Sequence, residues 1–181
     1  RSVDIAGLVK GASQGEGLGN AFLSNIREMN ALAHVVRCFE DENITHVDGS
    51  IDPVRDAEII NLELIMSDLE TVTKRILKCE KLLKTNDKKN RAEHEILIRI
   101  KNDLDQGKLI NIENFNEDER IIIKSFQLLS SKPTFYIANI SDDGFSYNAL
   151  NKLIEFANLS GNTVIPTSIK IEQEIAILDD E

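Results

Sequence analysis

The sequence predicts an α/β fold in which a parallel β-sheet is interrupted by an inserted helical hairpin. Short runs of branched and apolar residues near both ends of the 181-residue chain are typical of buried parallel strands. Between them lies an apolar seam that repeats every seven residues, which is typical of paired helices. We therefore expect residues 1–53 and 129–181 to build the sheet and residues 54–128 to form the insertion.

The first element is an apolar strand that ends in the pattern Asp-x-x-Gly, at Asp4 and Gly7. A carboxylate there can hold Mg²⁺ through a water molecule, and the glycine N–H can approach a terminal phosphate because no Cβ intrudes. The pattern alone is also typical of an ordinary turn. However, residues 11–19 contain four glycines and lead into helical apolar spacing over residues 21–29. A glycine-rich loop that feeds a helix is typical of a nucleotide-sensing switch.

The second strand is expected over residues 33–39, where Val35 and Val36 favour burial on both faces of the sheet. Asp52 and Pro53 then predict the start of a long helix, because Asp is a favoured cap and Pro is tolerated in the first turn.

The middle of the chain predicts an antiparallel pair of helices. Seam residues of the first helix are Leu62, Ile65, Leu69, Val72, Ile76, Cys79 and Leu83. The apolar face of the second helix consists of Ile96, Leu97, Ile100 and Leu104. We expect a turn over residues 85–90, an end to the second helix at Gly107, and a third helix over residues 117–129. The seam predicts packing between the helices, and a projecting arm for a macromolecular partner is the functional alternative.

The last part of the chain returns to the sheet pattern with a strand over residues 134–138. Asn139, Ile140 and Asp142 follow at its carboxyl end, where open α/β sheets bind ligands. In GTPases the corresponding Asn-Lys-x-Asp reads guanine, with the Asp accepting hydrogen bonds and the Lys stem covering the base. Alternatively, Asn139 and Asp142 cap a following helix. A final strand followed by a turn is expected over residues 163–170, with Ser168 and the N–H of Ile169 as candidate base contacts; by itself this segment is typical of a plain strand end.

These motifs together resemble the Obg-like ATPase family, called YchF in bacteria. The resemblance rests on Asp4 to Asn20, on Asn25 to Glu28, on His34 to Glu40, on Tyr136 to Asn139 and on the terminal Leu178 to Glu181. It implies a nucleotide-binding domain of the P-loop NTPase type, related to the Obg G domain, with a coiled-coil insertion. It also implies hydrolysis of ATP or GTP with Mg²⁺, binding to the ribosome, a role in translation or stress regulation, and a cytoplasmic location.

The nucleotide base remains an open choice between adenine and guanine. The family typically has Asn-x-x-Glu at this position, which is associated with ATP, whereas this chain has Asp142. Asp142 is the acceptor that guanine requires, yet Ile140 replaces the lysine that normally accompanies it. The resemblance therefore favours ATP, and GTP stays as the alternative.

The catalytic group is expected to be a histidine. Leu8 occupies the position after Asp-x-x-Gly where many GTPases keep a glutamine that orients water, and an aliphatic side chain cannot do so. The resemblance assigns this role to His46, in a polar loop after the second strand. His34 is expected to pack in the sheet, and His94 belongs to the helical arm. A residue from a bound partner is the alternative source of the missing group.

The limits of the chain also carry expectations. It begins at Arg1 and contains no Gly-x-x-x-x-Gly-Lys-Ser/Thr, the loop that cradles phosphates. Family members carry that loop upstream and a TGS domain downstream, so the chain is expected to be an internal fragment that by itself binds nucleotide feebly.

Composition restricts the partners. The net charge of −10 and the pI of about 4.8 argue against a general nucleic-acid-binding surface, so any contact with RNA must be local. No apolar run approaches the roughly 20 residues that a bilayer requires. Cys38 and Cys79 lack metal-site spacing and are expected to be reduced thiols. The alternative function is a non-hydrolysing interaction module that works through the helical hairpin. We expect this hairpin to be acidic.

Overall fold

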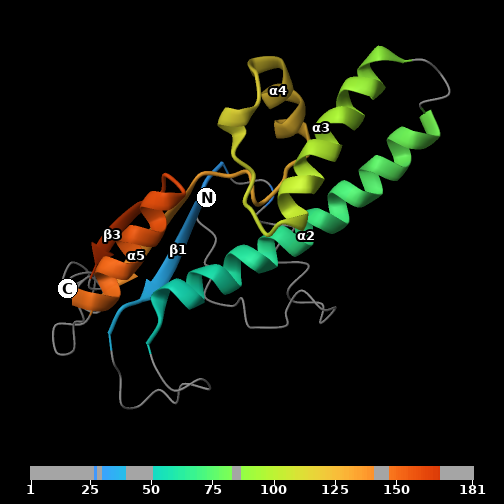
Figure 1. Cartoon of the computed structure of the whole chain (residues 1–181). Helices are drawn as coiled ribbons and strands as arrows, with labels where there is room; N and C mark the ends of the chain where they lie inside the picture. The colour runs from blue at the N-terminus through green and yellow to red at the C-terminus, as the bar shows by residue number, and fades with distance from the viewer. Residues whose placement is uncertain (1–26, 28–29, 40–50, 83–86, 141–146, 168–181) are drawn as a thin grey trace, which may run out of the picture. The chain divides into compact units, whose positions relative to one another are not determined.

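The structure is a computed structural model that describes residues 27, 30–39, 51–82, 87–140 and 147–167. These residues belong to two compact units (Figure 1). Of the described residues, one unit contains Arg27, Asn30 and those within Ile59–Lys132, and the other contains residues 31–39, 51–58 and those within 133–167. The boundaries expected from the sequence, at residues 53 and 128, remain predictions.

The second unit contains a parallel three-stranded sheet. Its strands are β1 (Leu32–Arg37), β2 (Thr134–Asn139) and β3 (Thr163–Thr167), in the order β1-β2-β3. All three run in the same direction. The parallel sheet expected from the sequence is therefore confirmed, with β2 in the centre of the described strands.

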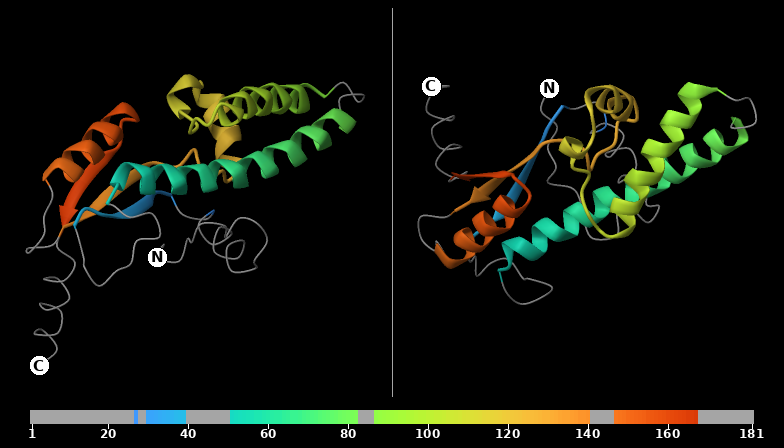
Figure 2. Two further views of the ribbon diagram at one scale, coloured as in Figure 1. Left: turned by 60° about the horizontal axis from the view of Figure 1, so that its bottom comes forward. Right: turned by 45° about the horizontal axis from the view of Figure 1, so that its top comes forward.

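One face of this sheet is buried by α5 (Tyr147–Leu159), which follows β2 (Figure 2). Buried side chains on this face include Val36, Cys38, Tyr136, Ala138, Leu153 and Ala157. On the opposite face Val35 remains 48% exposed. The expectation that β1 is buried on both faces was therefore wrong for the described residues, because the described helices pack on one face only.

The long helix α2 (Pro53–Leu82) begins where the sequence predicted. The Asp52 carboxylate accepts a hydrogen bond from the Arg55 N–H at 3.0 Å, which confirms Asp52 as the cap. The next helix, α3 (Lys88–Asp105), begins inside the turn that we expected over residues 85–90. It begins there because the Asp87 side chain accepts a hydrogen bond from the Lys89 N–H and caps it.

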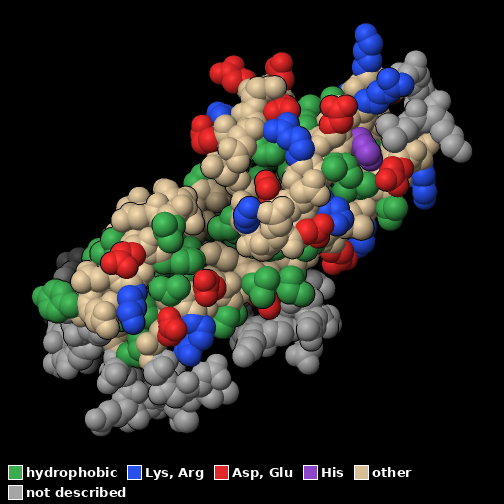
Figure 3. Space-filling view, viewed as in Figure 1, with side chains coloured by type: hydrophobic (Ala, Val, Ile, Leu, Met, Phe, Trp, Pro, Cys, Tyr) green, Lys and Arg blue, Asp and Glu red, His purple; other side chains and the backbone are tan. Residues whose placement is uncertain are grey.

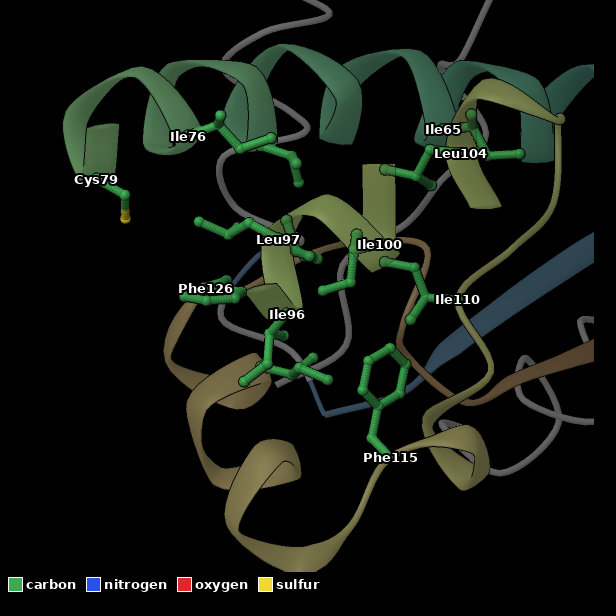
Figure 4. Close-up of a cluster of buried hydrophobic side chains, with 13 residues drawn as sticks. Ile65, Ile76, Cys79, Ile96, Leu97, Ile100, Leu104, Ile110, Phe115 and Phe126 are labelled. Atoms are coloured by element: carbon green, nitrogen blue, oxygen red, sulfur yellow. The ribbon is translucent and has the colours of Figure 1, made fainter. Parts of the chain in front are cut away.

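The helices α2 and α3 form the hairpin predicted from the seam (Figure 1). Figure 4 shows their apolar side chains pointing toward one another, with α4 and its flanking segments closing the cluster. Seam residues in this core are Ile65, Leu69, Val72, Ile76 and Cys79, and their partners on α3 are Ile96, Leu97, Ile100 and Leu104.

Leu62 is 52% exposed, so its expected place in the seam was wrong. The reason is the unequal length of the helices. At a rise of about 1.5 Å per residue, the 18 residues of α3 span roughly 27 Å, whereas the 30 residues of α2 span roughly 45 Å. Leu62 lies beyond the part of α2 that α3 covers, and the seam is closed only from Ile65 onward.

After α3, Gly107 adopts φ +71°, the left-handed conformation that glycine takes without strain and that ends helices. A short 3₁₀ helix, η3 (Ile112–Asn114), and α4 (Glu117–Ser125) follow. A capping box between Asn116 and Glu119 starts α4. The helix ends before the expected residue 129, because Gln127 has φ 52° and breaks the helical geometry. Among the described helices, none is long and apolar enough to cross a membrane.

The buried ring of His34 predicts a pH dependence of folding. Burial lowers the pKa of His34 from 6.5 to about 4, and its ring packs 5.6 Å from the ring of Tyr136. The unfolded chain therefore binds a proton between pH 6.5 and 4 that the folded chain excludes, so stability falls as the pH falls through this range. We expect a loss of about 2 kcal/mol between pH 7 and pH 5 from this residue.

His34→Phe should remove this part of the pH dependence while keeping an aromatic ring against Tyr136. Urea unfolding of the wild type and the variant at pH 7 and pH 5 measures the difference. The carboxylates are the same in both proteins, so their contribution to the pH dependence cancels. Equal losses of stability in the two proteins would contradict a neutral buried His34.

Candidate functional site

The carboxyl edge of the sheet brings together the two segments expected to contact the nucleotide base. Asn139 pairs with Arg37 of β1 on one side and with Thr167 of β3 on the other. Its carbonyl accepts a hydrogen bond from the Cys38 N–H at 2.8 Å, and the Ile140 N–H donates to the Thr167 carbonyl at 3.0 Å. Ser168 follows Thr167 directly in the sequence. The register therefore places the start of both base motifs side by side.

The side chains of Asn139 and Ile140 differ in their surroundings. Ile140 packs against the cluster that includes Ala138 and Leu150, on the face covered by α5. Asn139 is partly buried, and within the described residues no hydrogen bond to its carboxamide is found. Ile140 thus has a partly buried, packed side chain at the position where GTPases keep a lysine.

The thiol of Cys38, beside this edge, is poorly reactive. Cys38 is fully buried, and burial together with the charge of Asp56 raises the pKa of its thiol to about 11. Burial also raises the pKa of Cys79, in the hairpin core. Both cysteines are free thiols, as the sequence predicted. A protonated, buried thiol is a poor nucleophile.

Two of the three histidines have structural roles. His34 is buried and neutral within β1, which confirms its expected packing in the sheet. His94 lies on α3 as expected, and its ring is partly buried with Nε2 3.7 Å from the Glu80 carboxylate. Neither histidine lies at the carboxyl edge of a strand.

Several predicted site residues lie outside the described residues. They are Asp4, Gly7, Leu8, His46, Asp142, Ser168 and Ile169. Among the residues that the structure does describe, no group of three His, Cys, Asp or Glu side chains could hold a metal ion. The expected Mg²⁺ ligand Asp4 and the catalytic His46 therefore stay predictions.

The helical unit contains a buried polar cluster that the sequence analysis missed. Asp68 is 0% exposed and accepts hydrogen bonds from the N–H of Leu129 at 3.0 Å and from the N–H of Ser130 at 2.7 Å. The Ser130 hydroxyl also donates to the Asp68 carboxylate. One carboxylate thus fixes the segment between α4 and β2 onto α2.

Arg27 adds a positive charge to this cluster from a part of the chain far away in sequence. Its guanidinium lies 3.6 Å from the Asp68 carboxylate and donates to the Ser67 hydroxyl at 2.8 Å. The Lys132 ammonium donates to the Arg27 carbonyl at 2.9 Å. These contacts join Arg27 to residues of α2 and to Lys132, which are far from it in the sequence.

The charges in the cluster oppose the cost of burial. Burial raises the pKa of Asp68, while its hydrogen bonds to Ser130 and Leu129 and the nearby Arg27 act in the opposite direction. Burial likewise lowers the pKa of Lys132, which Asp68 counteracts. A signal for the cluster was present in the sequence, because Asp68 is a charged residue on the apolar stripe between Ile65 and Val72.

Comparisons with known proteins find relatives that are named YchF. No family model matches it. It is 48% identical over 182 residues to the ribosome-binding ATPase YchF of Bacillus subtilis (strain 168), covering 98% of this chain and 50% of that protein. It is 46% identical over 180 residues to the protein of the same name from Escherichia coli O157:H7, covering 99% and 50% respectively. The chain therefore spans about half the length of the curated relatives it matches.

A solved structure gives the same result for the fold. The YchF GTPase of Schizosaccharomyces pombe matches with a TM-score of 0.74 and 35% sequence identity, over 93% of this chain and 48% of that chain. The match confirms the α/β fold of the P-loop NTPase type that the sequence predicted.

The buried Asp68 cluster predicts a large effect of a single substitution. Asp68→Ala removes the acceptor of three hydrogen bonds and leaves the Arg27 charge without its partner, so we expect a loss of roughly 3 to 5 kcal/mol in unfolding free energy. Ser67→Ala is the matched control, because it removes only one bond from Arg27 and should cost less than about 1 kcal/mol. Chemical denaturation measures both. Equal effects would contradict a central role for the carboxylate.

Proposed function

Because this chain belongs to the Obg-like ATPase family, called YchF in bacteria, we propose that the full-length protein hydrolyses ATP with the help of Mg²⁺. The observation that carries the proposal is the register of the sheet, which aligns Asn139 with Thr167 at its carboxyl edge. In this proposal Asn139 and Asp142 contact the base together with Ser168 and the Ile169 N–H.

The surroundings of Ile140 support adenine over guanine. Its side chain is partly buried and packs against the cluster that includes Ala138 of β2 and Leu150 of α5. A side chain held there is not available to cover a base as the lysine of a GTPase does. The relatives are named ATPases in B. subtilis and E. coli and a GTPase in S. pombe, so GTP remains the second candidate.

The water that attacks the γ-phosphate needs a group to orient it, and we assign this role to His46. Leu8 is aliphatic, while His34 and His94 are held in the sheet and in the hairpin. An unperturbed imidazole with a pKa near roughly 6.5 is largely neutral at neutral pH and can accept a hydrogen bond from water. Asp4 would hold Mg²⁺, which neutralises charge on the transferring phosphate, and Gly7 would donate its N–H there.

Binding to the ribosome belongs to the same proposal, because the bacterial relatives carry it in their names. We infer a role in translation and a cytoplasmic location from that partner. The alternative is a non-hydrolysing module that works through the helical hairpin. Single-turnover hydrolysis of ATP by the full-length protein separates the two, since the module predicts no turnover.

The base assignment predicts how two substitutions change specificity in the full-length protein. Ile140→Lys should shift binding toward GTP, because it restores the lysine that accompanies Asp142, although part of the gain is offset by the lost core contact. Asp142→Glu should shift binding toward ATP. Ile140→Met is the control that keeps an apolar side chain, and competition between labelled nucleotides gives the ratios. If the ratio does not move in either variant, residues 139–142 act as a helix cap.

The catalytic assignment predicts that His46→Ala lowers kcat while leaving nucleotide affinity nearly unchanged, because a group that orients water acts mainly in the transition state. We expect a decrease on the order of a hundredfold or more, as is typical for the loss of a proton-transfer or positioning group. His94→Ala, which alters the hairpin only, should keep the wild-type rate. An unchanged rate in His46→Ala would transfer the role to a residue of a bound partner.

A further inference from the structure

The buried cluster around Asp68 joins charged residues that are far apart in the sequence. Arg27, Asp68 and Lys132 meet there, and all three belong to the same compact unit. Figure 3 shows charged side chains spread over the surface of the molecule, whereas Asp68 is 0% exposed. Desolvation of a buried ion pair offsets its Coulomb attraction, so stability alone is a weak reason for charges at this place.

Arg27 is held both by its side chain and by its main chain. Its guanidinium donates hydrogen bonds to the Ser67 hydroxyl at 2.8 Å and to the Gln127 carbonyl at 3.3 Å. Its own carbonyl accepts a hydrogen bond from the Lys132 ammonium at 2.9 Å. Together these contacts fix the backbone position of Arg27 as well as the direction of its side chain.

The Gln127 carbonyl that binds Arg27 belongs to a residue in an unfavourable backbone conformation. Gln127 has φ 52°, and in the part of the chain that the structure describes it is the only residue other than glycine with a positive φ. A glycine would end α4 in the same way without strain. Residues in sparsely populated conformations gather at functional sites, so the strain at Gln127 points to a function for its contact with Arg27.

Asp68 and Arg27 are not held equally firmly in the cluster. The Asp68 carboxylate accepts three hydrogen bonds from Leu129 and Ser130, none of which involves Arg27. The Arg27 side chain is 22% exposed, and its guanidinium lies 3.6 Å from the carboxylate, beyond hydrogen-bond distance. Loss of the Arg27 side chain should therefore leave Asp68 anchored, and the roles of the two residues can be measured separately.

The position of Arg27 in the sequence connects this cluster with the proposed function. Arg27 lies 20 residues after Gly7 and eight residues after Gly19, the last glycine of residues 11–19. Glycines give the backbone much conformational freedom, whereas groups that act on a phosphate must be held in place. A fixed point close by in the chain meets that need, and Arg27 is the first described residue after these glycines.

We propose that Arg27 is a positioning residue for nucleotide hydrolysis and that Asp68 acts through it, an inference that rests on the proposed function. The helix α2 supplies the fixed point through Ser67 and Asp68. Arg27 passes this restraint along the chain to Asp4 and Gly7, and it touches neither substrate nor metal itself. Its loss should slow the chemical step more than it weakens nucleotide binding, because the sheet register places the ends of β2 and β3 without Arg27.

Three single variants of the full-length protein test the proposal. Arg27→Gln removes the charge, whereas Arg27→Lys keeps a charge beside Asp68 but lacks the planar set of donors. Arg75→Gln is the matched control, because Arg75 also pairs with a carboxylate in the same unit, that of Glu93 at 3.5 Å. Single-turnover hydrolysis at saturating ATP measures the chemical step. Equilibrium binding of a labelled, non-hydrolysable ATP analogue measures nucleotide affinity.

We expect Arg27→Gln to lower the single-turnover rate roughly ten- to a hundredfold and to change nucleotide affinity by less than about threefold. Arg27→Lys should recover part of the rate, and Arg75→Gln should stay within about twofold of the wild type. An unchanged rate in Arg27→Gln, or an equal loss in Arg75→Gln, overturns this inference and leaves the proposed function standing. No hydrolysis by the wild type overturns the proposed function and this inference with it.

Hydrogen exchange separates positioning from a purely structural role of Arg27. The amides of Leu129 and Ser130 donate to Asp68, so their protection reports whether this anchor is intact. We expect the same protection in Arg27→Gln as in the wild type. Loss of protection in the variant would mean that Arg27 holds the fold and would overturn the positioning role.

A double variant tests whether Asp68 acts through Arg27. Asp68→Asn removes the charge and keeps the shape of the side chain. The double variant Arg27→Gln with Asp68→Asn should hydrolyse ATP no more slowly than Asp68→Asn alone, because Arg27 then has no carboxylate to act with. Losses of rate that multiply in the double variant would show that the two residues act independently and would overturn the link to Asp68.

Discussion

The helical unit depends on one buried carboxylate. Asp68 is completely shielded from water and is stabilised by two main-chain N–H groups, one hydroxyl and the guanidinium of Arg27. A buried charge of this kind tolerates little rearrangement, because each lost partner leaves an uncompensated group. The cluster therefore fixes the segment between α4 and β2 onto α2 and holds Arg27 against it.

The sheet depends on the parallel register of its strands as the helical unit depends on Asp68. Asn139 and Thr167 are 28 residues apart in the sequence, yet they are direct partners at one edge of the sheet. Main-chain hydrogen bonds from Cys38 and Ile140 complete this edge. Because these bonds belong to the ladder itself, the backbone holds the carboxyl ends of β2 and β3 side by side.

Charge and packing occupy different parts of the hairpin. The apolar seam and the contacts of Arg75 and Asn90 hold the two helices together, whereas Lys78, Lys81, Lys88 and Lys89 are exposed. A net charge of −10 for the whole chain conceals this separation.

The sequence by itself determined the parallel sheet, the hairpin, the cap at Asp52 and the protein family, because periodicity, caps and motifs are local in the chain. The tertiary structure decided what depends on distant contacts. Leu62 left the seam because α3 is shorter than α2, Val35 remained exposed because the described helices pack on one face, and Asp68 became a buried anchor because Ser130 and Arg27 meet there. Such partners are far apart in sequence, and only folding brings them together.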